Sequence, residues 1–201
     1  MKAGAMDYAD QASLDTLWDE IRALTANIRL HHIHEDRFIH PLLSSRVPGG
    51  DRKLQRQHEE VDRQLEDLLA HLDGIRSRDA AFEKSRQLGL EFYLALNRFI
   101  ALFLEHIDEE EEHIQPTLWN LCTTEELVTA WRTIMASKTR EEAMEDLGMI
   151  FSAANLEEIT GLLTKFKAVA PPAAFQEVCK SAEHILSAPD WSTVVSRIGI
   201  E

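Results

Sequence analysis

Apolar residues recur at alternating steps of three and four along three long stretches of the chain, which is the pattern of helices packed in a bundle. The first stretch, about residues 10–45, has a seam of Leu14, Leu17, Ile21, Leu24, Ile28, His31, Glu35, Phe38 and Leu42. The second, about 51–76, has Leu54, His58, Val61, Leu65, Leu68, Leu72 and Ile75. The third, about 80–120, has Phe92, Leu96, Phe99, Phe103, His106 and Glu110.

Breaks and cap signals divide the rest of the chain. Segments 44–51 and 74–81 read as turns, with Asp51 a candidate N-cap, and the third helix should end near residues 121–124. Shorter helices are predicted after it by two capping boxes, an Asn N-cap and two proline starts: Thr123-x-x-Glu126, Thr139-x-x-Glu142, Asn155, Pro171-Pro172 and Pro189-Asp190. We therefore predict an all-α fold, with a three-helix up-and-down bundle over 1–122 and a helical extension over 123–201 packed on it.

Composition narrows the classes of function. The 201 residues include 35 acidic and 21 basic side chains, and a net charge of −14 argues against nucleic acid and anionic membrane surfaces as partners. No run of eighteen apolar residues exists, so no membrane span is expected, and residues 1–11 lack the apolar core of a secretion signal. Cys122 and Cys179 fit no metal spacing or disulfide framework, so a cytoplasmic location is expected.

Five polar residues interrupt the apolar seams: His31, Glu35, His58, His106 and Glu110. Burying such groups costs several kcal/mol unless each gains a partner. Two helices carry the pair His-x-x-x-Glu, whose side chains leave the same helical face about one turn apart. Imidazole and carboxylate ligands together suit iron, manganese or zinc, and di-metal bundles place such ligands on facing helices. The five residues are therefore candidate metal ligands.

The two pairs also lie inside a local repeat. HHIHEDRFIHP (31–41) aligns without gaps with HIDEEEEHIQP (106–116), so that His31 falls on His106 and Glu35 on Glu110. In both copies a Pro follows the pair by about one turn, where it should end or kink the helix. His32 and Asp36 lie beside the first seam and would replace His31 and Glu35 if that helix were rotated.

HHIHEDRFIHPLL, QHEEVDRQLEDL and EHIDEEEEHIQPTLW resemble the second, third and fourth helices of a hemerythrin-like (HHE cation-binding) domain, over about residues 7–122. The resemblance implies a four-helix bundle that holds non-haem iron, usually two ions and here two or one. It implies His31, His58 and His106 as terminal ligands, and Glu35 and Glu110 as bridging carboxylates. It also implies binding or sensing of O2, a related small ligand or iron itself.

One departure from the family matters. Its first helix usually carries a further His ligand, and no segment of this chain resembles that helix. An open apolar groove would remain in the bundle, and exposed apolar patches favour association. We therefore expect the gap to be covered by a second subunit in a homodimer or by the C-terminal helices, unless a segment upstream of Met1 supplies the helix.

Binding or sensing is favoured over catalysis, because no nucleophile, phosphate loop or acid–base dyad is evident besides the candidate ligands. One alternative is a metal-free helical interaction protein, whose fold would be indifferent to chelators. The other is a ferritin-like di-metal oxidase or peroxidase, which commonly uses Glu-x-x-His pairs. Here the order is reversed and the spacing is four, so this enzyme class is the least favoured.

Overall fold

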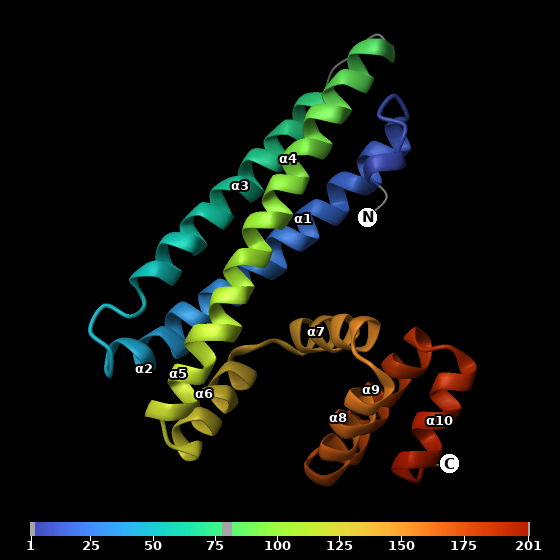
Figure 1. Cartoon of the computed structure of the whole chain (residues 1–201). Coiled ribbons are helices and arrows are strands. Elements are labelled where there is room, and N and C mark those ends of the chain that lie inside the picture. Colours follow the sequence, from blue (N-terminus) through green and yellow to red (C-terminus); the bar gives the residue numbers. More distant parts are fainter. Residues whose placement is uncertain (1–2, 78–81, 201) are drawn as a thin grey trace. The chain divides into compact units, whose positions relative to one another are not determined.

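A computed structural model of the chain describes residues 3–77 and 82–200 (Figure 1). It divides into two compact units, one up to Trp131 and one from Arg132. Each unit is described by itself. Both are built of helices, and the described residues include no strand, which confirms the predicted all-α class.

The first unit is dominated by three long helices that run up and down in chain order (Figure 1). α3 packs against both α1 and α4. The elements of this unit are η1 (Ala3–Ala5), α1 (Gln11–His34), η2 (Glu35–Ile39), α2 (His40–Ser44), α3 (Arg52–Arg76), α4 (Phe82–Glu109), η3 (Glu110–Ile114), α5 (Gln115–Leu121) and the first part of α6 (Thr124–Ser137), in which the division falls. The three predicted helices are thus present; the second is continuous, whereas η2 and η3 interrupt the first and the third.

The seams of α3 and α4 are those that the sequence predicts. All seven predicted positions of α3 are buried, from Leu54 to Ile75, and they are its complete set of buried residues. On α4 and η3 the predicted positions are buried except Phe103, which is half-buried. The spacing of three and four predicts the buried face correctly here because the apolar residues of these helices fall on one face and the polar residues on the other.

The predicted seam of α1 is wrong at two positions. Leu24 is 37% exposed, whereas its neighbour Thr25 is only 3% exposed. The buried Thr25 hydroxyl donates to the Ile21 carbonyl at 2.8 Å, which satisfies it within the helix. The seam therefore passes from Ile21 through Thr25 and Ile28 to His32, and His31 is exposed.

Both copies of the repeat contain a widened helical turn. η2 and η3 are π-helical, and the His40 N–H bonds to the Glu35 carbonyl as the Gln115 N–H does to the Glu110 carbonyl. A proline follows each of these donors and would clash with the carbonyl four residues earlier in a regular α-helix. The wider turn removes that clash, so the helix continues past the predicted kink.

The two predicted turns that flank α3 differ in detail from the structure. Asp51 stands at the N-cap of α3 but accepts no bond from the helix backbone. Its carboxylate instead accepts from the Gln55 side chain at 2.9 Å, so the predicted N-cap position is confirmed but without a side-chain capping bond. Of the turn predicted over 74–81, residues 78–81 lie outside the described part of the chain, and α3 continues to Arg76.

The second unit contains α7 (Arg140–Ala153), α8 (Leu156–Val169), α9 (Pro172–Ile185) and α10 (Ala188–Ile198). Its core includes Phe151, Ile159, Leu163, Ala182 and Val194. The capping box at Thr139 and the N-cap at Asn155 are confirmed, and the structure adds a reciprocal bond from Glu158 at Asn155. At Thr123 and Glu126, side chain and backbone also bond reciprocally, as predicted. The boundary after residue 122 and the packing of the extension on the bundle stay predictions.

One helical stretch among the described residues, Ser85–Leu121, is long and apolar enough to cross a bilayer by length and composition alone, with a mean hydropathy of 1.3. In this fold, Phe92, Leu96 and Phe99 of that stretch contribute to the core of the bundle. Core helices of folded domains pass the same test of length and composition. The absence of a membrane partner stays a prediction.

Candidate metal centre

Four of the five predicted ligands meet near one end of the bundle. Glu35 begins η2, His58 lies in α3, His106 in α4 and Glu110 begins η3. One ligand atom from each lies within 4.8 Å of the others. His58 Nε2 is 3.4 Å from Glu35 Oε2, and His106 Nε2 is 3.3 Å from Glu110 Oε1. Three chain segments far apart in sequence thus supply one mixed imidazole–carboxylate cluster.

The cluster lies between two apolar layers. On one side of the cluster, the three chain segments contribute residues such as Ile28, Val61 and Phe99 to the main core of the bundle. On the other side, they contribute Leu43, Leu54 and Leu118 to a smaller core. Because the polar groups are enclosed by apolar side chains, water has little access, and electrostatic interactions there are strong.

His31, the fifth predicted ligand, lies at the edge. Its Nε2 is 3.3 Å from Glu35 Oε1, but its side chain is 46% exposed and belongs to none of the candidate ligand groups. Its neighbour His32 is buried, and a ring nitrogen of His32 lies within 4.8 Å of ligand atoms of His58 and His106. The structure therefore brings His32 into the imidazole cluster and leaves His31 outside it.

Two aspartates orient the imidazoles. His58 Nδ1 lies 3.1 Å from Asp36 Oδ1, and His32 Nδ1 lies 3.1 Å from Asp62 Oδ1. A carboxylate accepts, so each ring donates from Nδ1 and keeps the lone pair of Nε2 free for a cation. Asp62 is not among the residues that the sequence pattern predicts, although it follows His58 by four residues and so lies on the same helical face.

His40 joins the outer side of this group. His40 Nδ1 is 2.8 Å from the same Asp36 oxygen that faces His58, and the His40 and His58 rings stack with centroids 5.1 Å apart. One ligand atom each of Asp36, His40 and His58 also lies within 4.8 Å of the others. Asp36 is exposed, so its carboxylate lies between solvent and the buried rings of His40 and His58.

Burial keeps the inner imidazoles neutral. It lowers the pKa of His32 to about 3 and that of His106 to about 4, and the nearby His58 acts in the same direction on both. At neutral pH both rings therefore carry a lone pair instead of a second proton. Neutral imidazole is the form that binds a metal, so these rings are ready to act as ligands without a deprotonation step.

The two glutamates behave as a coupled pair. Burial raises the pKa of Glu110 to about 9, and the negative charge of Glu35 adds to the effect. Burial also acts to raise the pKa of Glu35, but the contacts with His58 and His31 outweigh it, so the net shift is downward. Two carboxylates this close hold one proton between them until a cation takes its place.

The donor set fits a metal ion. Several of its buried polar atoms have no hydrogen-bond partner, namely His32 Nε2, Glu35 Oε2, His58 Nε2 and both ring nitrogens of His106. Buried polar atoms without partners are costly, and here they converge on one region. A divalent cation would satisfy them together, with nitrogen and oxygen ligands of the kind that iron, manganese and zinc accept.

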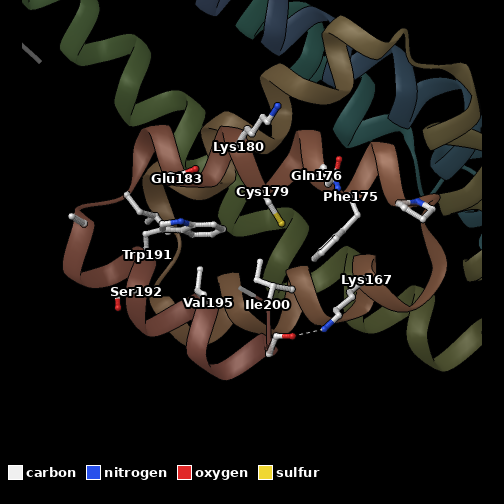
Figure 2. A pocket seen from close by; sticks show the side chains of 14 residues that line it. Lys167, Phe175, Gln176, Cys179, Lys180, Glu183, Trp191, Ser192, Val195 and Ile200 are labelled. Atoms are coloured by element: carbon white, nitrogen blue, oxygen red, sulfur yellow. Dashed lines mark hydrogen bonds between the residues drawn. The ribbon is translucent and has the colours of Figure 1, made fainter.

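A groove of about 1010 Å³ in the second unit is of a different kind. Figure 2 shows Phe175, Cys179, Trp191, Val195 and Ile200 lining it, with Lys167 at one end. The Lys167 ammonium already donates to the carbonyls of Ile198 and Gly199. Burial raises the pKa of the Cys179 thiol, which keeps it protonated and unreactive. Among the described residues, no candidate metal group includes a residue of this groove.

Comparison with known families agrees with this chemistry. The Hemerythrin HHE cation binding domain matches residues 3–118, more than half of the chain, and the match includes all the clustered ligands. No curated protein matches the chain, and no solved structure matches it. The chain therefore belongs to the hemerythrin HHE cation-binding family.

Proposed function

We propose that this protein binds non-haem iron at Glu35, His58, His106 and Glu110, and that it binds or senses O2 or a related small ligand there. The observation that carries the proposal is the convergence of buried nitrogen and oxygen atoms that have no hydrogen-bond partner. Ferrous iron would supply a coordination position able to take such a ligand. The chain itself supplies neutral imidazoles, carboxylates and an apolar enclosure.

The arrangement of Glu35 favours two ions over one. Its Oε1 is 3.3 Å from His31 Nε2, and its Oε2 is 3.4 Å from His58 Nε2. One carboxylate that offers a separate oxygen to each of two imidazoles is suited to bridge two cations. The carboxylate pair Glu35–Glu110 would lose its shared proton when a cation binds.

The proposal is tested with two ligand variants and two matched controls in the full chain. His106→Ala and Glu110→Ala should abolish ferrous binding, because each removes a buried ligand. His113→Ala and Glu111→Ala should bind as the wild type does, because these exposed residues lie in the same segment but outside the cluster. The measurements are anaerobic ferrous titration and metal content per chain, followed by visible absorption after O2 is admitted.

The outcomes separate the competing hypotheses. About two irons per chain in the wild type would support the di-iron centre, and about one a mononuclear site. Full metal retention in both ligand variants would contradict the site. A wild-type chain that takes up no iron and whose unfolding is unchanged by chelators would favour the metal-free interaction protein.

The remaining expectations on partners stay proposals. The charge of −14 disfavours nucleic acid and anionic membranes, and the location is proposed to be cytoplasmic. Leu90, Leu94 and Leu104 on α4 are exposed, so an apolar surface exists that a homodimer would cover. Sedimentation equilibrium of the full chain measures this directly, and a monomer at all concentrations would rule the dimer out.

A further inference from the structure

The packed face of α1 places His32 towards the interior. Thr25, Ile28 and His32 are buried at successive steps of three and four, so His32 occupies the next position on the seam. Its side chain is 3% exposed, and its Nε2 is buried without a hydrogen-bond partner. A histidine that is buried only for packing would be expected to satisfy both nitrogens, so the free Nε2 needs an explanation.

α1 and α3 carry the same short motif at the point where they meet. His32 is followed four residues later by Asp36, and His58 is followed four residues later by Asp62. The two chain segments run in opposite directions (Figure 1). The contacts are crosswise, because His32 Nδ1 faces Asp62 and His58 Nδ1 faces Asp36, both at 3.1 Å. The two His–Asp pairs are therefore equivalent by local two-fold symmetry.

The rings themselves confirm this equivalence. The His32 and His58 imidazoles stack with centroids 3.9 Å apart and planes 10° apart. The His106 ring stands nearly perpendicular to both, at 5.6 Å from His32 and 4.9 Å from His58. One nitrogen from each of the three rings lies within 4.8 Å of the other two. His32 therefore lies as close to the His58 and His106 nitrogens as a shared ion would require of a ligand.

We propose that His32 is a metal ligand of the centre and that Asp62 is its positioning residue. Together with His58 and His106, His32 gives three inner imidazoles that suit a borderline divalent cation such as Fe²⁺, Mn²⁺ or Zn²⁺. The inference rests on the proposed metal function and assigns a ligand that the sequence pattern placed outside the seam.

The test compares neighbouring histidines on α1 in the full chain. His32→Gln removes the proposed ligand itself. It should weaken Fe²⁺ binding at least as much as removal of a group that only orients a ligand, which costs roughly 10–100-fold. Asp62→Asn should fall in that roughly 10–100-fold range, because it weakens the bond that fixes the His32 ring. His31→Gln should have a smaller effect than His32→Gln, and the exposed His113→Gln should have none.

Two further readouts separate ligation from a structural role. X-ray absorption of the iron-loaded protein should lose one imidazole scatterer in His32→Gln and none in His113→Gln. In His32→Gly, added free imidazole should restore Fe²⁺ affinity and the scatterer together. Circular dichroism of the metal-free variants reports whether each still folds, and a folded His32→Gly makes the imidazole experiment decisive.

The results distinguish this inference from the proposed function. If His32→Gln binds iron as the wild type does while His106→Ala does not, His32 is no ligand but the centre stands. If His31→Gln weakens binding more than His32→Gln, the ligand is the one that the sequence pattern predicted. If the wild type binds no Fe²⁺, Mn²⁺ or Zn²⁺, both the inference and the proposed function fail.

Discussion

His31 and His32 are adjacent, yet they have opposite environments. The sequence pattern predicts the wrong buried face for α1, because leucine is more often buried than threonine and the pattern therefore places Leu24 on the seam instead of Thr25. Thr25 is nevertheless buried, because its hydroxyl bonds to the carbonyl four residues earlier and leaves only a methyl group to pack. This local hydrogen bond removes the cost of burying the Thr25 hydroxyl, so the buried face of α1 can pass through Thr25 to His32.

Close packing at Gly89 gives a prediction at the same scale. A Cβ at Gly89 would lie 2.2 Å from Cδ2 of the buried Tyr8, whose hydroxyl donates to the Ala3 carbonyl. Gly89→Ala should therefore lower the free energy of unfolding by about 1–3 kcal/mol, as overpacking usually does. The matched control is Gly74→Ala in α3, where no atom lies within 4 Å and a gain of up to about 1 kcal/mol is expected.

Urea unfolding followed by circular dichroism measures both glycine variants. Equal stability of Gly89→Ala and the wild type would show that the Tyr8 ring moves aside without loss of packing. A loss in Gly74→Ala would instead indicate that the exposed face of α3 has a role beyond helix formation.

At the scale of elements, the helices could be predicted from spacing, but their internal geometry could not. The α3 seam is correct at every position. Pro41 and Pro116 predicted an end or a kink in each helix. The helices instead continue through a π-helical turn just before each proline. The outcome depends on the core of Leu43, Leu54 and Leu118 beyond the turns, which holds the continuing helices in place. Each turn begins with a candidate ligand, Glu35 or Glu110.

This coincidence predicts that the prolines act on the metal site. In Pro41→Ala and Pro116→Ala, the restored N–H can bond to the carbonyl four residues earlier, which favours a regular α-helical turn. Narrowing that turn would shift the glutamate at its start, so we expect the double variant to bind Fe²⁺ about tenfold more weakly. Pro189→Ala is the control, because this proline lies in the first turn of α10, where a missing N–H is tolerated. Unchanged affinity in the double variant would show that the cores alone fix the turns.

At the scale of the whole molecule, the chain has two units with separate hydrophobic clusters. The family match ends at residue 118, so it lies within the unit that holds the candidate metal centre and includes none of α7–α10. The sequence predicted a change of helix length near this point, but the position of the division follows from which helices share a core. The proposed chemistry therefore belongs to the first unit.

Separate cores predict separate responses to mutation. Leu163 is fully buried in the second unit, so Leu163→Ala should destabilise that unit by about 2–5 kcal/mol. Fe²⁺ affinity should stay at the wild-type value, because no ligand of the centre packs in that cluster. Calorimetry with and without Fe²⁺ measures both effects, since a ligand that binds only the folded first unit raises the transition of that unit. A large loss of affinity in Leu163→Ala would mean that the two units are coupled.

The sequence by itself determined the helical class, the bundle, the seams of α3 and α4, and four candidate ligands that the structure brings together. It could do so because the spacing of apolar residues along one helix predicts its buried face, and a polar residue on that face signals a group whose burial needs a partner. The tertiary structure decided the register of α1, the π-helical turns and the crosswise pairing of His32 with Asp62 and of His58 with Asp36. These features depend on which side chains meet between helices, and no spacing within a single helix specifies that contact.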